Sequence, residues 1–148
     1  MFSFLSWGKK DISHNSKKVK KWQKEHQKLG EYAGKIIAAY DKKDLKQTRK
    51  LLIKFKDMAL AHLMDEDETF FKLLNKAEAK DQHIIDKIKE FRTSFTNVKV
   101  VLFTFLTHYT NPQNELDITF KETLDQIILA LTDRIGFEEQ NLYRLINN

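Results

Sequence analysis

Apolar residues recur every three or four positions along four long stretches of the chain, which is the spacing of one face of an α-helix. This spacing predicts helices over residues 16–42, 44–75, 79–109 and 116–146. The third helix is expected to end before Pro112, because proline disfavours helical geometry in the residue that precedes it. The 148 residues contain only four glycines and one proline, too few for the many tight turns of a β domain.

Short polar turns separate the four stretches. The side chain of Ser16 or Asn15 is suited to capping the first helix, and that of Asp44 is suited to capping the second. Long helices joined by short connections usually pack as antiparallel neighbours. We therefore expect an all-α fold, an up-down-up-down four-helix bundle over residues 16–148, preceded by a short N-terminal arm over residues 1–15.

Three of the four predicted apolar faces contain ionisable residues where an apolar residue is expected. These are His26 in the first helix, His62 and Glu66 in the second, and Glu138 in the fourth. His83 lies at the edge of the apolar face of the third helix. A single inward histidine is usually a hydrogen-bonded core residue, but several buried ionisable groups need partners or a metal ion.

The predicted depth of these residues in the bundle strengthens the metal interpretation. At a rise of about 1.5 Å per residue, the groups from the first, second and fourth helices fall within about one turn of each other, with His83 slightly shallower. His62 and Glu66 are four positions apart and share a helical face. Imidazole binds iron, zinc, copper or nickel, and carboxylates suit hard cations. A metal site explains an inward His62 and Glu66 better than a chance surface position does.

The order and spacing of these residues resemble the hemerythrin superfamily, in its HHE cation-binding branch. The family pattern has a histidine on the first helix, His-x-x-x-Glu on the second, a histidine early on the third and His-x-x-x-Glu on the fourth. The stretches EHQKL, HLMDEDETFF and DQHII supply His26, His62 with Glu66, and His83. The resemblance covers roughly residues 22–146.

The fourth helix departs from the family pattern. In RIGFEEQNLYRLI, Glu138 keeps the glutamate, but Arg134 stands where the family has histidine. Arginine has no lone pair and cannot replace an imidazole ligand. Arg134 either pairs with Glu138, leaves a coordination position open for water or an exogenous ligand, or marks a pocket that no longer binds metal. Lys87, one turn after His83, adds a second cation, so both are expected modulators of the site.

The resemblance implies two iron atoms in the bundle, whereas the departure at Arg134 leaves open one iron atom, or none if the site is degenerate. It implies Glu66 and Glu138 as bridging carboxylates, together with an oxygen species, and histidines as terminal ligands. Glu139 is a substitute ligand if the fourth helix is rotated. Relatives bind or sense small molecules, so the expected function is binding of oxygen or a related diatomic such as nitric oxide, or sensing of oxygen or iron. An enzyme acting on peroxide or nitric oxide is left open, because fold does not decide activity.

Composition limits the other partners and the compartment. The net charge is +5, but the lysines are mixed with acidic residues, and the dense run at residues 17–24 is read as a solvated helix start rather than a nucleic-acid site. No stretch approaches the roughly 18–20 apolar residues of a membrane span. The start MFSFLSWGKK makes a poor secretory signal, since its charges follow the apolar part. The absence of cysteine fits a reducing compartment, and a cytoplasmic location is expected.

A second hypothesis is a metal-free helical bundle that acts through its surface as an interaction or regulatory module. The apolar residues within 1–7 and the basic run at 17–24 motivate it. Such an arm either packs on its own domain or contacts a protein partner or a membrane. Packing on its own domain is the simpler expectation.

Overall fold

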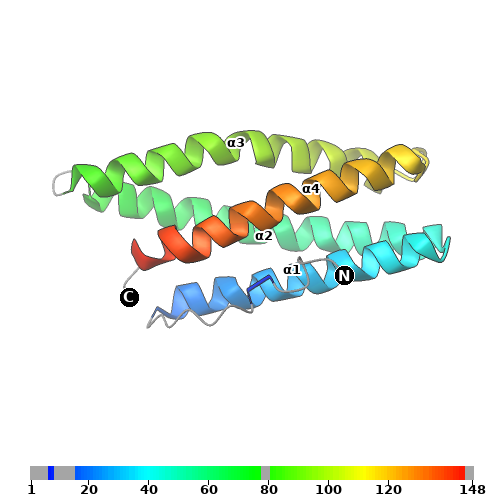
Figure 1. The fold of residues 1–148 in the computed structure, drawn as a ribbon, viewed down its shortest axis with the longest axis horizontal. Helices are drawn as coiled ribbons and strands as arrows, with labels where there is room; N and C mark the ends of the chain where they lie inside the picture. The colour runs from blue at the N-terminus through cyan, green and yellow to red at the C-terminus, as the bar shows by residue number, and fades with distance from the viewer. Residues whose placement is uncertain (1–6, 9–15, 78–80, 146–148) are drawn as a thin grey trace.

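The computed structural model describes residues 7–8, 16–77 and 81–145, and the predicted four-helix fold is confirmed over these residues (Figure 1). The chain runs up and down between consecutive helices, so that each helix lies antiparallel to the next. The helices, in chain order, are α1 (Lys17–Asp41), α2 (Leu45–Ala77), α3 (Gln82–Thr110) and α4 (Ile118–Phe137). A π-helical turn, η2 (Glu138–Leu142), and a 3-10 turn, η3 (Tyr143–Leu145), continue α4.

Each of the four helices begins after a side chain that accepts a backbone N–H of its first turn, which satisfies a donor that the helix itself leaves unpaired. Ser16 Oγ accepts such a bond at 3.3 Å at the start of α1, and Asp44 Oδ1 at 3.2 Å at the start of α2. Asp81 and Asp117 cap α3 and α4 in the same way. Helix α3 ends two residues before Pro112, as the sequence predicts.

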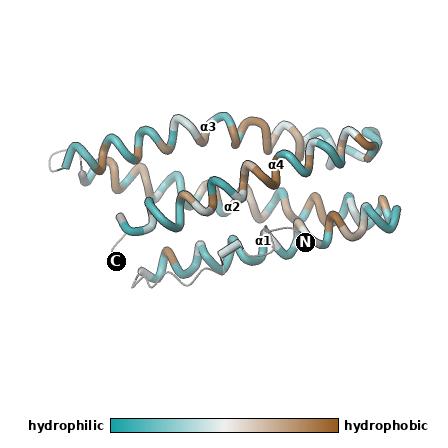
Figure 2. Tube along the Cα trace, in the orientation of Figure 1, coloured by the Kyte–Doolittle hydropathy of each residue, from teal (hydrophilic) through white to brown (hydrophobic). Residues whose placement is uncertain are grey.

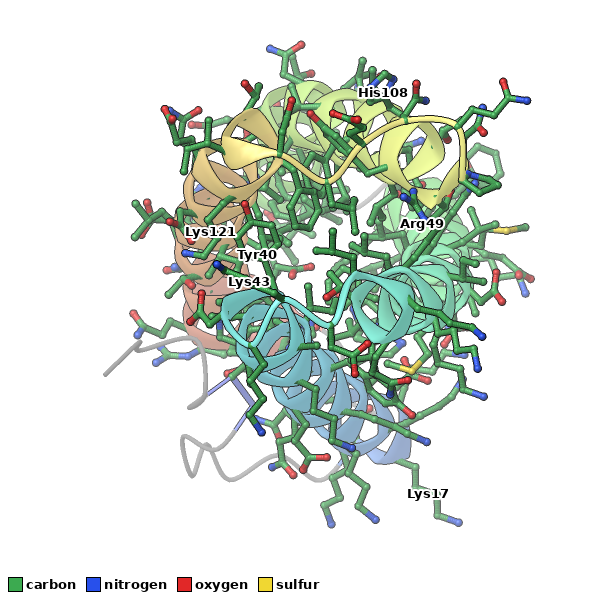
Figure 3. The ribbon with its side chains drawn as sticks, turned by 90° about the vertical axis from the view of Figure 1, so that its right-hand side faces the viewer. Lys17, Tyr40, Lys43, Arg49, His108 and Lys121 are labelled. Atoms are coloured by element: carbon green, nitrogen blue, oxygen red, sulfur yellow. The ribbon has the colours of Figure 1, made fainter. Side chains whose placement is uncertain are left out.

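Viewed along their length, the helices surround a common interior (Figure 3). Hydrophobic and hydrophilic residues alternate along each helix rather than forming one long apolar run (Figure 2). The buried face of α3 begins at Ile85, and Ile84, next to His83, is only half-buried. No helix in the described part of the chain is long and apolar enough to cross a bilayer.

One end of the bundle is closed by a side chain that reaches from α2 to the α3–α4 connection. The Arg49 guanidinium donates to the carbonyl oxygens of Tyr109, Asn111 and Asn114 at 2.7, 2.8 and 3.0 Å (Figure 3). His108 lies exposed at this end, near the last turn of α3. These hydrogen bonds give the carbonyls of the connection a charged donor, which fixes the position of α4 relative to α2.

The described part of the N-terminal arm packs on the bundle. Trp7 is buried and donates from Nε1 to Thr132 Oγ1 on α4 at 2.9 Å, while Gly8 accepts a bond from Gln27 on α1 at 2.9 Å. Gly8 has φ of +70°, and a Cβ there would collide with the carbonyl oxygen of Gln23. Only glycine fits this close approach. The remaining arm residues, 1–6 and 9–15, lie outside the described residues.

The basic run at the start of α1 lies largely on the outer surface of the helix. Lys17, Lys20 and Lys24 are exposed. Two lysines of the same segment, Lys18 and Lys21, pair instead with Asp65 on α2 at 2.7 and 3.0 Å. Two of the lysines in this segment therefore form ion pairs with α2.

Candidate metal centre

Five imidazole and carboxyl side chains lie inside the described part of the bundle, and none of them is more than 4% exposed. They come from α1, α2 and the π-helical turn after α4, and include the four residues that the sequence places at one depth. These side chains are His26, His62, Glu66, Glu138 and Glu139. Because an unpaired charge in an apolar interior is costly, the contacts within this group decide what it can bind.

His62 is held between two carboxylates. Its Nδ1 lies 2.7 Å from Oε1 of Glu25, which is on α1 and partly reaches solvent. Its Nε2 lies 3.3 Å from Glu66 Oε1, one turn along α2. A carboxylate at Nδ1 fixes the ring orientation and the proton at that nitrogen, and leaves Nε2 to face the interior.

In His26, too, the Nδ1 atom faces a carboxylate and the Nε2 atom faces the interior of the bundle. Its Nδ1 lies 2.9 Å from Glu139 Oε2, and its Nε2 lies 3.0 Å from His62 Nε2. Glu138 Oε1 is 3.8 Å from the same Nε2. With both Nδ1 atoms facing carboxylates, the two Nε2 atoms converge on each other. Two nitrogen lone pairs cannot share that space without a proton or a cation between them.

The charges around the two rings differ, and so do their pKa values. Burial lowers the pKa of His62, but the charge of Glu66 and the hydrogen bond to Glu25 outweigh it and raise the pKa to about 9. Burial lowers the pKa of His26, and the hydrogen bond to Glu139 does not compensate. Without a metal, His62 therefore carries the proton that lies between the two Nε2 atoms, and His26 accepts it.

The two carboxyl groups beside the imidazoles have opposite shifts. Burial raises the pKa of Glu66, but the charge and hydrogen bond of His62 lower it to about 2. Burial and the charge of Glu66 hold the pKa of Glu138 well above its usual range. Glu66 is therefore ionised and Glu138 protonated in the metal-free centre. Glu138 Oε2 is buried without a hydrogen-bond partner among the described residues, and Glu66 Oε1 faces His62 Nε2 at 3.3 Å. Both oxygens can accept a cation.

Tyr143 closes the group on the side of η3. Its hydroxyl donates to Glu66 Oε2 at 2.6 Å and lies 3.3 Å from His26 Nε2. Burial raises its pKa well above the usual value, so it remains a donor. This bond fixes one oxygen of Glu66 and leaves the other facing His62.

The π-helical turn η2 brings two consecutive glutamates into the interior. Glu138 and Glu139 are 2% and 3% exposed. Consecutive residues of a helix point about 100° apart, and the buried face is wide enough here to hold both, as it is at His62 and Leu63 on α2. Turns of π-helix are often found at functional sites. The sequence analysis offers Glu139 as a substitute ligand, and here it contacts the Nδ1 atom of His26 instead.

The structure does not bring His83 to this group. His83 is the second residue of α3 and its side chain is exposed, as is that of Lys87. Phe95, which lies beside His26 and His62, comes twelve residues later, or about 18 Å along the helix at about 1.5 Å per residue. The sequence predicts that His83 lies slightly nearer the end of the bundle than the other candidate ligands, but it is well separated from them.

Arg134 points toward α3. Its Nη2 donates to Ser94 Oγ at 2.8 Å and to the Phe91 carbonyl at 3.4 Å, and its guanidinium carbon lies 4.7 Å from the centre of the Phe91 ring. Its charge acts on Glu138 and lowers the pKa of that carboxyl, without overcoming the effect of burial. Arg134 Nε is buried and has no hydrogen-bond partner in the described structure.

A cavity of about 30 Å³ adjoins the two imidazoles. His26, His62, Arg134 and Glu138 are its polar lining residues, and the others are apolar. The apolar lining includes Trp7 of the arm, together with side chains from all four helices: Leu29, Phe55, Ala59, Leu63, Phe95, Leu102, Leu131 and Ile135. A space of this size holds one water molecule or one ligand of similar size.

A family model for the hemerythrin HHE cation binding domain matches residues 17–146. The chain belongs to this family. No curated protein and no solved structure shows a significant match to the chain. Within this hemerythrin-like domain, His26, His62 and Glu66 each offer a ligand atom, and these atoms lie within 4.8 Å of one another. The nitrogen and oxygen donors of the group fit a transition-metal ion such as iron.

Proposed function

We propose that this hemerythrin-like domain holds iron through His26, His62 and Glu66, with Glu138 as a further carboxylate, and binds or senses oxygen or a related diatomic ligand there. The observation that carries the proposal is the convergence of two Nε2 atoms at 3.0 Å beside a buried carboxylate. A cation between them would replace the proton that they share in its absence. Iron in such a centre supplies an open coordination position and a reversible redox change.

The residues around the ligands support a binding role. Glu25 and Glu139 accept from the Nδ1 atoms and so orient both imidazoles, the arrangement commonly found behind metal-ligating histidines. Tyr143 holds one oxygen of Glu66. The chain therefore orients the ligand atoms before any metal arrives, which reduces the entropy lost on binding.

The size of the cavity beside the imidazoles favours binding of a small ligand over binding of a large substrate. Its volume of about 30 Å³ leaves room for a water molecule or a ligand of similar size, and most of its lining is apolar. Such a lining excludes water from the ligand. The Arg134 Nε–H has no other partner among the described residues, and we infer that it donates to a ligand in this space.

Iron reconstitution tests the proposal. Untagged protein is incubated anaerobically with ferrous iron, desalted and analysed for iron, and then exposed to nitric oxide or oxygen while its absorption spectrum is recorded. We expect bound iron and a spectral change in the native protein. A His62→Ala, Glu66→Ala variant should retain at least tenfold less iron. Equal iron contents in the two proteins, or iron that gives no spectral change with either gas, would contradict the proposal.

A further inference from the structure

Helix α3 presents aromatic rings, not ligand atoms, at the level of the imidazoles. Phe95 lines the cavity together with His26 and His62. Phe91 stacks on Phe95 with ring centres 5.4 Å apart. His83, the second residue of α3, lies about 18 Å from Phe95 at about 1.5 Å per residue. Helix α3 therefore offers no imidazole at this depth within its described length.

Helix α4 places a positively charged arginine, and not a metal ligand, one turn before Glu138. Arg134 lies one turn before Glu138, at the position where the family pattern has histidine. Ser94 and the Phe91 carbonyl hold its guanidinium against α3, and the rings of Phe91 and Phe137 lie 4.7 and 5.5 Å from it. A fixed guanidinium on this side of Glu138 repels a metal ion and has no lone pair to donate to it.

All nitrogen donors of the centre therefore come from α1 and α2. His26 and His62 converge on one point, and no second pair of donors faces the carboxylates from α3 or α4 in the described structure.

We propose that the centre takes one divalent metal ion, held by His26, His62 and Glu66, and that Arg134 provides the positive charge that a second metal would otherwise supply. This inference rests on the proposed function, because it concerns the same ligands. It departs from the two-iron centre that the family resemblance implies.

Metal stoichiometry separates the two proposals. Metal-stripped, untagged full-length protein is titrated anaerobically with ferrous iron, and with Mn²⁺ as a spectroscopic probe. We expect one tightly bound equivalent of either metal, and the electron paramagnetic resonance spectrum of an isolated Mn²⁺ ion. Two equivalents, or the spectrum of a magnetically coupled manganese pair, would overturn the one-metal inference and leave the proposed function standing. No binding of either metal would overturn both.

The His83→Ala variant supplies a second test that does not risk the fold, because this side chain is exposed. We expect it to bind one equivalent with an affinity within about twofold of the native protein. The matched loss-of-ligand variant, His26→Ala, should lower the affinity by at least tenfold. A comparable loss in His83→Ala would show that α3 supplies a ligand, and would overturn the inference even if the native stoichiometry were one.

Discussion

At the scale of single residues, the centre is organised by carboxylates that stand behind the ligands. Glu25 and Glu139 lie 2.7 and 2.9 Å from the Nδ1 atoms of His62 and His26. Each bond fixes a proton on the outer nitrogen, so that the two inner nitrogens face each other and can both bind a cation once it displaces the proton they share. Glu25 remains partly exposed and its pKa is lowered, because the hydrogen bond and charge of His62 outweigh its burial. It therefore stays ionised in its role as acceptor.

Asp65 joins α2 to the start of α1 and provides a test of pH dependence. It accepts from Lys18 Nζ at 2.7 Å, Trp22 Nε1 at 2.8 Å and Lys21 Nζ at 3.0 Å. Burial raises its pKa, but these three donors lower it well below the usual range. The folded-state pKa therefore lies below the unfolded one. The resulting stability is fully present above the unfolded pKa, near 4, and is lost as the pH falls through the folded pKa.

We expect Asp65→Asn to lower the free energy of unfolding by about 1–2 kcal/mol at pH 7, because the amide cannot accept charge-assisted bonds of the same strength. The difference from the native protein should shrink as the pH falls from about 4 toward 2. Urea unfolding at pH 7 and pH 2.5 measures both values. A difference that is equal at the two pH values would show that the Asp65 charge contributes nothing to stability.

The sequence predicts only part of the centre at this scale. Helical spacing places His26, His62, Glu66 and Glu138 at one interior depth, and the structure brings them together; that they hold a metal stays a prediction. Glu25 could not be assigned in this way, because its position on the helix surface gives no periodic signal. His83 follows the family pattern in sequence order, but the register of α3 leaves it exposed.

At the scale of elements, the Trp7–Gly8 segment of the arm covers the gap between α1 and α4 and lines the cavity. We expect Gly8→Ala to displace this segment, because Gly8 has φ of +70° and no room for a Cβ. The melting temperature should fall by several degrees, and acrylamide should quench more of the tryptophan fluorescence.

Gly136→Ala is the matched control for this prediction. Gly136 lies in α4, and a Cβ there meets no atom within 4 Å. Alanine favours the helix by up to about 1 kcal/mol relative to glycine, so this variant should melt at the same or a higher temperature, with unchanged quenching. Equal melting temperatures for Gly8→Ala and the native protein would show that the docking of the arm does not depend on Gly8.

The helix boundaries follow closely from local sequence signals, whereas the π-helical turn does not. Ser16, Asp44 and Pro112 mark helix ends through their own side chains and backbone, and these ends agree with the structure within a few residues. The turn η2 depends on the interior partners of Glu138 and Glu139, which come from α1 and α2. A pattern read along one helix cannot contain contacts with helices far away in the sequence.

At the scale of the whole molecule, apolar spacing and short connections were sufficient to predict the four-helix bundle, because burial of one face per long helix leaves few other arrangements. The same interior must also accommodate a group of imidazoles and carboxylates. The metal-free centre does so with shared protons. A bound cation would replace those protons and draw the same side chains around it.

The central claim is that a metal ion binds between the converging nitrogens of His26 and His62 and the carboxylate of Glu66. Anomalous diffraction from crystals of the iron-loaded protein, measured on both sides of the iron absorption edge, tests it most directly. We expect an anomalous peak within bonding distance of both Nε2 atoms and a Glu66 oxygen. Iron found only at exposed residues such as His83 or His108, with no peak among these three ligands, would contradict it.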